Sequence, residues 1–348
     1  MNWKPLLKWS RENYCDLPWR KNRTLYTTLV SEIMLQQTTV STVLNHFERF
    51  LKQFPDIQRL SQASEEEMVM AWKGLGYYRR ARSLLSAAVE ICERFGGEIP
   101  LDRDDLLSIK GIGPYTASAI TAIGANKAEL ALDANLERVI ARLYLFDQEK
   151  GPKLQRAIRE SYIQSKILTG IEKHPRDINE ALMDLGRVFC QARKADCVIC
   201  PLQNDCQAYQ TGQALEFPVV SLKTKTKTQN NKHDLTLLRI VVQKGEKVLG
   251  TKKQVGQWLE GQVEVPTYIL STSDKKLNQY PRFEGKKAPE PDFEFKTGIT
   301  KYKISNVVVK MTEADFKNKF SDQDTSFYSV DTKKANLATS TIKILGRL

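Results

Sequence analysis

The chain has 348 residues, with 53 Lys and Arg against 41 Asp and Glu, so its formal net charge at pH 7 is +12. This length predicts more than one domain, and the charge favours a phosphate-rich partner or an anionic membrane surface. No apolar run reaches the roughly 18 residues that span a bilayer, and the N-terminus lacks the apolar core of a secretory signal. The sequence therefore predicts a cytoplasmic protein that is not embedded in a membrane.

The first two thirds of the chain show helical spacing of apolar residues, with recurrences at three and four positions. Examples are the run Leu44, Phe47, Phe50 and Leu51 and the run Leu84, Leu85, Ala88 and Ile91. Glycine and proline interrupt this pattern repeatedly, which indicates many short helices joined by tight loops. Residues 1–211 are predicted to be all-helical.

A change of composition follows this helical region. Residues 212–232 are polar and alternate lysine with threonine, which predicts a linker. Beyond it, period-two or β-branched runs at 235–242, 261–270 and 304–310 predict strands, and Lys244-Gly245-Glu246 predicts a turn. Residues 233–348 are therefore expected to form a smaller α+β domain.

Glu32 is the first candidate for chemistry. Apolar residues surround it in sequence, at Leu29, Ile33, Met34 and Leu35, and they cover nearly the whole circumference of the predicted helix. The carboxyl group is therefore expected at a buried position, with a raised pKa that makes it a proton donor near neutral pH. A surface glutamate on an amphipathic helix is the alternative, and it fits this segment poorly.

A glycine-rich turn follows the segment Leu106-Leu107-Ser108-Ile109-Lys110. Gly111 and Gly113 flank an aliphatic residue just before an alanine-rich helix, so backbone N–H groups can approach a phosphate closely at the helix N-terminus. An ordinary turn between two helices is the alternative interpretation. In a basic chain the pattern resembles a helix–hairpin–helix element, which would bind the DNA backbone without reading sequence.

Asp133 precedes another predicted helix, in Leu132-Asp133-Ala134-Asn135. Aspartate at that place is a favoured N-cap, which is a sufficient structural explanation.

Four of the six cysteines fall within a short segment, at Cys190, Cys197, Cys200 and Cys206. This clustering predicts a metal site in a reducing compartment. By spacing alone, structural zinc and an iron–sulfur cluster are both open, because deprotonated sulfur holds either one.

Several segments together resemble the MutY family of adenine DNA glycosylases, in the endonuclease III superfamily, over roughly residues 3–217. They are Leu17-Pro18-Trp19-Arg20, Ser31 to Thr38, Gly74-Leu75-Gly76-Tyr77-Tyr78, Gly111 to Thr116, Asn179 to Gly186 and the cysteine loop 190–206. The resemblance implies a monomeric, nucleoid-associated base-excision-repair enzyme that removes adenine mispaired with 8-oxoguanine or guanine in double-stranded DNA. It also implies that the four cysteines hold a [4Fe-4S] cluster that has a structural and DNA-positioning role and does no redox work on the substrate.

The resemblance assigns roles to individual residues. Glu32 would protonate the adenine ring, Asp133 would stabilise the positively charged sugar, and Tyr115 would assist both. Gln37 and Tyr77 would wedge into the base stack, while the adenine pocket would be lined by Arg20, Leu35 and Glu180. Relatives that also cut the strand carry a lysine nucleophile where this chain has Tyr115, so a monofunctional enzyme is expected.

The resemblance is weaker in the C-terminal domain. In the family this is a Nudix-like domain that reads 8-oxoguanine through a Phe-Ser-His loop, which would fall at Ile299-Thr300-Lys301 here. The altered residues at Ile299 and Lys301 predict weaker discrimination between 8-oxoG:A and G:A pairs. Two alternatives remain: a thymine glycosylase acting on G:T mismatches, since Tyr115 also resembles those enzymes, and a non-catalytic iron–sulfur DNA-binding protein.

Overall fold

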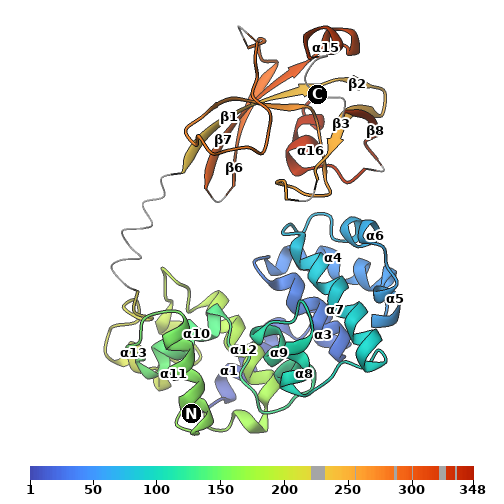
Figure 1. Cartoon of the computed structure of the whole chain (residues 1–348). Coiled ribbons are helices and arrows are strands. Elements are labelled where there is room, and N and C mark those ends of the chain that lie inside the picture. The colour runs from blue at the N-terminus through green and yellow to red at the C-terminus, as the bar shows by residue number, and fades with distance from the viewer. Residues whose placement is uncertain (221–231, 255, 286–287, 300, 321–326, 334) are drawn as a thin grey trace. The chain divides into compact units, whose positions relative to one another are not determined.

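A computed structural model describes residues 1–220, 232–254, 256–285, 288–299, 301–320, 327–333 and 335–348. The chain divides into two compact units, Met1–Thr226 and Lys227–Leu348, and each is described here by itself (Figure 1). In the described part of the chain, no helix is long and apolar enough to cross a membrane.

The first unit is helical, as the apolar spacing predicted. Its α-helices, in chain order, are α1 Lys4–Tyr14, α2 Pro18–Lys21, α3 Leu25–Leu35, α4 Val40–Gln53, α5 Ile57–Ser61, α6 Glu65–Ala71, α7 Arg79–Phe95, α8 Arg103–Ser108, α9 Pro114–Ala119, α10 Ala134–Tyr144, α11 Pro152–Ile163, α12 Pro175–Val188 and α13 Gln207–Gln210. Shorter turns are the π-helical η1 Ile120–Gly124, which continues α9, and the 3-10 segments η2 Ile171–Lys173, η3 Cys197–Ile199 and η4 Gln203–Asp205.

The two largest apolar cores among the described residues of this unit are built from different sets of helices. One joins helices α2 to α9 around residues such as Phe47, Phe50 and Trp72, and the other joins α1 with α10 to α12 around residues such as Leu136 and Leu182. Helix α12 contacts α1, α10 and η1, and α3 contacts α9 and η1 (Figure 1). Because η1 contacts helices of both groups, it brings the two cores together near the end of α9.

The described residues of the second unit form two sheets and two helices, so this unit is α+β as predicted. Its elements are β1 His233–Val241, β2 Gln243–Lys244, β3 Lys247–Lys252, β4 Val263–Glu264, β5 Thr267–Thr272, β6 Phe293–Ile299, β7 Tyr302–Lys310, α15 Glu313–Phe320, β8 Tyr328–Asp331 and α16 Thr339–Leu345. One sheet has the order β5-β1-β7-β6, in which β1 and β7 are parallel. The other has the order β2-β3-β4, with β8 pairing β3.

The strand prediction for residues 261–270 was wrong in one respect. This run is two strands, because β4 pairs with β3 in one sheet and β5 pairs with β1 in the other. Pro266 lies between them and has no N–H for a ladder, which favours the break there. The turn at Lys244-Gly245-Glu246 is confirmed, with Gly245 at φ +60° between β2 and β3.

Candidate active site

Glu32 lies in the last half of α3, and its burial is confirmed: it is 6% exposed. The hydroxyl of Tyr115 donates a hydrogen bond to Glu32 Oε2. Burial raises the pKa of Glu32 to about 7, and the nearby charges of Glu180 and Asp133 also raise it. The Tyr115 hydrogen bond and Arg20 oppose this shift. Glu32 therefore retains its proton in a large fraction of molecules at neutral pH.

Tyr115 stands at the start of α9, directly after the glycine turn. Gly111 adopts φ +100°, and a Cβ there would lie 2.4 Å from the carbonyl oxygen of Ser83, so only glycine fits. Gly113 has φ −94° in extended backbone as the N-cap of α9. Helices α8 and α9 with this turn form the helix–hairpin–helix arrangement that the sequence indicated. Burial raises the pKa of Tyr115 well above its usual value, so the phenol stays protonated and donates its hydrogen bond to Glu32.

Asp133 is the N-cap of α10, as its position before the helix predicted. Its Oδ1 accepts from the backbone N–H groups of Asn135 (2.9 Å) and Leu136 (2.7 Å). The Asn135 side-chain amide donates to Oδ2 at 2.8 Å. Burial raises the pKa of Asp133, while these three hydrogen bonds favour its ionised form and oppose the rise. The carboxylate is thus held in one orientation at the positive end of a helix.

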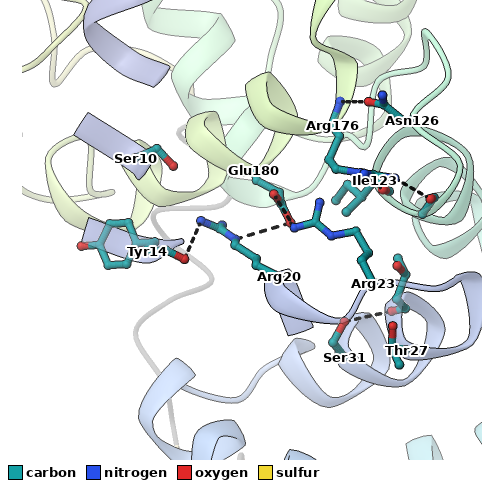
Figure 2. Close-up of polar contacts among 12 residues, drawn as sticks. Ser10, Tyr14, Arg20, Arg23, Thr27, Ser31, Ile123, Asn126, Arg176 and Glu180 are labelled. Atoms are coloured by element: carbon teal, nitrogen blue, oxygen red, sulfur yellow. Dashed lines mark hydrogen bonds and ion pairs between the residues drawn. The ribbon is translucent and has the colours of Figure 1, made fainter. Parts of the chain in front are cut away.

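A buried ion-pair cluster lies next to these carboxyls. Arg20 on α2 pairs with Glu180 (3.4 Å) and with Asp184 (2.9 Å) on α12. Arg23 pairs with Glu180 from the other side at 3.0 Å, and Ser10 donates to Asp184 at 3.0 Å. Figure 2 shows Arg20 and Arg23 converging on Glu180. All the ionic side chains of the cluster are at most 11% exposed, so it is fixed by packing.

Five predicted site residues therefore come together at one place between the two helical cores. They are contributed by five elements: Arg20, Glu32, Tyr115, Asp133 and Glu180. Their charges act on one another, since Glu180, Asp133 and Arg20 all shift the pKa of Glu32. Leu35 is partly buried at the end of the same helix that carries Glu32 and packs on the first core.

Gln37 and Tyr77 occupy two loops, Gln37 just after α3, which carries Glu32, and Tyr77 just before α7. Both are exposed, Tyr77 by 62%, and both adopt left-handed backbone conformations, with φ of 55° and 47°. Non-glycine residues adopt this conformation rarely, and such strain concentrates at functional sites. Both side chains are thus available to a ligand outside the protein.

Sequence reasoning missed the residues that hold the site residues in place. Asn135 orients Asp133, and Arg138 in turn donates to Asn135 Oδ1 at 2.9 Å. Arg23 and Asp184 complete the ion-pair cluster. The signal for Asn135 was its spacing after the N-cap, whereas the partners of Arg20 are distant in sequence and left no local pattern.

The four cysteines of the 190–206 loop line one cavity. Its other walls are mainly apolar and come from α10, α12 and the loop itself: Val139, Leu143, Leu185, Phe189 and Leu202. Arg142 Nη1 lies 3.2 Å from Cys190 Sγ and supplies a positive charge beside the sulfur atoms. In the residues that the structure describes, no group of three or more His, Cys, Asp or Glu side chains is arranged to hold a single metal ion.

The proposed reading loop of the second unit is the β6–β7 hairpin. Thr300 lies outside the described residues, and Lys301 is exposed, its carbonyl accepting from the His233 N–H at 2.8 Å. Sequence reasoning missed the aromatic rings beside this hairpin. The Tyr302 ring lies 5.4 Å from the His233 ring and 4.9 Å from the Trp258 ring, and its hydroxyl donates to Asp274.

Comparison with known proteins agrees with this arrangement. Residues 30–165 match the model of the HhH-GPD superfamily base excision DNA repair proteins. An adenine DNA glycosylase of Buchnera aphidicola subsp. Schizaphis graminum is 31% identical over 272 residues, which are 78% of this chain and 71% of that protein. A thymine/uracil-DNA glycosylase of Pyrobaculum aerophilum is 35% identical over 209 residues, 59% of this chain and 90% of that protein.

Among solved structures, a thermostable thymine-DNA glycosylase matches with a TM-score of 0.50 and 26% identity, covering 60% of this chain and 94% of its own. Fold and site therefore define a helix–hairpin–helix protein of base excision repair. Within that class, the chain belongs to the adenine DNA glycosylase family. It spans between 39% and 62% of the length of the six other curated adenine DNA glycosylases compared.

Proposed function

We propose that this chain is a monofunctional, monomeric DNA glycosylase that hydrolyses the N-glycosidic bond of adenine mispaired with 8-oxoguanine or guanine in double-stranded DNA. One observation carries the proposal: a buried Glu32 with a pKa raised to about 7 lies beside Tyr115 and within reach of the charge of Asp133. Two carboxyls in different environments suit glycosidic hydrolysis: Glu32 keeps its proton to higher pH, whereas three hydrogen bonds favour the charged form of Asp133.

Glu32 acts as the general acid. Adenine is a poor leaving group, and protonation of its ring at N7 lets the base depart as a neutral molecule. A carboxyl group with a pKa near 7 combines a bound proton with a useful tendency to release it. Tyr115 holds the Glu32 carboxyl in one position through its hydroxyl.

Asp133 stabilises the charge that develops on the sugar. Its two oxygens are fixed by Asn135 and Leu136, so the carboxylate needs no reorganisation as the oxocarbenium-like sugar forms. It either remains an electrostatic partner or bonds briefly to the sugar until water attacks.

Arg20 and Glu180 line the pocket with Leu35 and hold polar groups toward the extruded base. Gln37 and Tyr77 fill the space that the base leaves in the duplex, since both are exposed at loop tips. Extrusion costs a few kcal/mol and less at a mismatch. Gly111 and Gly113 bring backbone N–H groups of the α8–α9 turn to the DNA backbone.

The reaction leaves the DNA strand intact. Schiff-base chemistry needs an amine at the sugar, and this chain has Tyr115 where strand-cutting relatives have a lysine nucleophile. The Tyr115 phenol, which donates a hydrogen bond to Glu32, has no amine and cannot form that covalent adduct.

Cys190, Cys197, Cys200 and Cys206 hold a [4Fe-4S] cluster. The donor set supports this, because four thiols line one mainly apolar cavity and the Arg142 guanidinium offsets part of the negative charge of a thiolate-bound cluster. When bound, the cluster cross-links the loop after α12 and stabilises it. The residues 190–206 then support α10, the helix whose N-cap is Asp133.

The second unit is a Nudix-like domain that meets the base opposite adenine. The Lys301 ammonium can donate to a carbonyl oxygen of 8-oxoguanine, and the rings of His233, Trp258 and Tyr302 lie next to this hairpin. Lysine cannot accept a hydrogen bond, so we expect the preference for 8-oxoG:A over G:A to be weaker than in the family.

One assay tests the activity. Purified protein is incubated with duplexes containing 8-oxoG:A, G:A or G:T, and strand breaks are measured before and after alkali. Breaks that form only after alkali, and only in the adenine-containing strand, are expected. Breaks before alkali would overturn the monofunctional assignment, and none in any duplex would overturn the enzyme assignment.

The G:T duplex tests a second candidate function. The similarity to a thymine/uracil-DNA glycosylase over 90% of that protein favours a thymine glycosylase. The presence of Glu32 favours adenine as the excised base, because a pyrimidine does not need ring protonation to depart. Excision of thymine alone would show that the enzyme is a thymine glycosylase and not an adenine glycosylase.

Iron and zinc analysis of the same sample, with about four irons expected per chain, tests the cluster separately.

A further inference from the structure

The loops that carry Gln37 and Tyr77 are joined by one side chain. Arg80, in the first turn of α7, donates from Nη1 to the carbonyl oxygens of Ile33 (2.9 Å), Met34 (2.8 Å) and Gln36. Its Nη2 donates to Thr38 Oγ1 at 2.9 Å and to the carbonyl oxygens of Leu75 (3.0 Å) and Gly76 (3.2 Å). The residues on either side of Gln37 and those before Tyr77 therefore share one guanidinium group.

Arg80 also contacts Tyr77 directly. Its guanidinium carbon lies 5.6 Å from the centroid of the Tyr77 ring and 5.6 Å from that of Trp72. A guanidinium stacks favourably on aromatic faces at this distance. The indole of Trp72 donates to the Gly76 carbonyl at 3.1 Å, which ties the second loop to the core.

The position of Arg80 is unfavourable for the helix that carries it. A positive charge in the first turn of a helix opposes the helix dipole. In contrast, the same charge lies at the C-terminal end of α3, where the last carbonyl groups lack helical partners and attract cations. The hydrogen bonds that Arg80 makes to the two loops therefore explain its location, whereas the stability of α7 does not.

We propose that Arg80 is a positioning residue for base extrusion, which sets the spacing of Gln37 and Tyr77 so that both side chains enter the DNA stack together. This inference rests on the proposed function. A planar guanidinium with several donors can bond to both loops at once, whereas the single ammonium of lysine cannot reach acceptors on both sides with the same geometry. Both loops are strained at their tips and need such an external restraint.

The test compares Arg80→Lys with Arg82→Lys, which removes another guanidinium of α7, one that pairs with Glu65. Single-turnover excision of adenine from a G:A duplex is expected to fall about tenfold or more in Arg80→Lys and less than about twofold in Arg82→Lys. Wild-type excision in the same assay shows that the proposed function itself holds. Equal rates for Arg80→Lys and wild type would overturn the inference.

Two comparisons distinguish a structural role of Arg80 from a positioning role. The first changes the DNA substrate, and the second changes the protein background in which Arg80→Lys is made. Adenine opposite an abasic site is already unpaired and costs less to extrude, so the loss in Arg80→Lys should shrink there. In a Gln37→Gly, Tyr77→Gly background, which lacks both wedging side chains, Arg80→Lys should cost less than about twofold further. The same tenfold loss on both substrates and in both backgrounds would show that Arg80 acts only through folding.

Thr38→Val gives a second test that leaves Arg80 and its own contacts with carbonyl groups in place, and it also removes the hydrogen bond from Thr38 Oγ1 to the Gln36 carbonyl at 3.3 Å. It removes one hydrogen bond to Nη2 from the Gln37 loop, so a loss of about threefold on G:A is expected. 2-Aminopurine in place of the adenine reports extrusion directly by its fluorescence. A normal fluorescence increase in both Arg80→Lys and Thr38→Val would overturn the proposal.

Discussion

In each unit, the structure describes a buried glutamate that accepts a hydrogen bond from a tyrosine. The two glutamates differ in whether a cationic side chain forms an ion pair with them. Glu264 in the second unit is 1% exposed and pairs with Arg239 (2.6 Å) and Lys253 (3.9 Å). Tyr280 donates to it at 2.9 Å. In the first unit Glu32 accepts from Tyr115, and among the described residues no cation forms an ion pair with it.

This difference distinguishes a glutamate that stabilises the fold from one that can take part in a reaction. A buried carboxylate with direct cationic partners holds its neighbours in place, and removing one member of the ion pair leaves buried charges without a partner. A buried carboxyl without them keeps its proton to higher pH and can deliver it. We therefore propose that Glu264 stabilises the second unit and that Glu32 acts in catalysis.

The largest expected effect is on adenine excision. Glu32→Gln and Asp133→Asn should each lower the single-turnover rate by about a thousandfold, because each removes a charge or proton that acts in the transition state. Binding to the mismatch should stay within a few-fold, measured by gel shift, and Glu264→Gln serves as the control at a temperature where it is folded. Near-normal turnover by Glu32→Gln would remove its general-acid role.

The two glutamates should differ in the sign of their effect on stability. The pKa of Glu32 rises from its ordinary 4.5 to about 7 in the folded protein, so wild type loses stability as pH rises through this window. Glutamine does not titrate, and Glu32→Gln should be more stable than wild type by about 3 kcal/mol at pH 8 and nearly equal near pH 4.5.

Glu264→Gln should be less stable by about 3 kcal/mol at pH 8, since Arg239 and Lys253 lose their partner. Calorimetry of both variants and wild type at the two pH values measures this. Shifts of the same sign for the two variants would contradict the distinction between them.

The pH dependence of adenine excision tests whether Glu32 is the group that supplies the proton. Above pH 7 the protonated fraction of Glu32 falls, so the single-turnover rate should decrease about tenfold per pH unit. The Tyr115 hydrogen bond lowers the pKa of Glu32, so Tyr115→Phe should move the midpoint of this decrease to higher pH, whatever its effect on the maximal rate. A midpoint that stays in place or moves down would show that another group titrates.

The smallest effect is expected from removing the second unit. A chain of residues 1–220 keeps both helical cores and all five clustered site residues, so excision from G:A should persist. The ratio of rates for 8-oxoG:A and G:A should change less than about tenfold, because the altered hairpin is expected to discriminate weakly. A large loss confined to 8-oxoG:A would show that this unit reads the lesion strongly.

Local patterns in the sequence determined much of this protein. Apolar spacing predicted the helices, because one turn fixes which residues share a face. The burial of Glu32 followed from its apolar neighbours within one helix, and the N-cap role of Asp133 followed from its place before another. The turn at Gly111 was predicted for the same reason, since its backbone geometry is set within a few residues.

Only the tertiary structure decided which distant residues meet. Arg20 and Glu180 form an ion pair although they lie far apart in the sequence. Arg80 donates hydrogen bonds to both the Gln37 loop and the Tyr77 loop. The sequence spacing of these residues predicted neither contact. The division of residues 261–270 between two sheets was likewise set by strand partners far along the chain. Periodicity and caps are properties of neighbouring residues, whereas ion pairs and strand partners depend on how separate elements pack together.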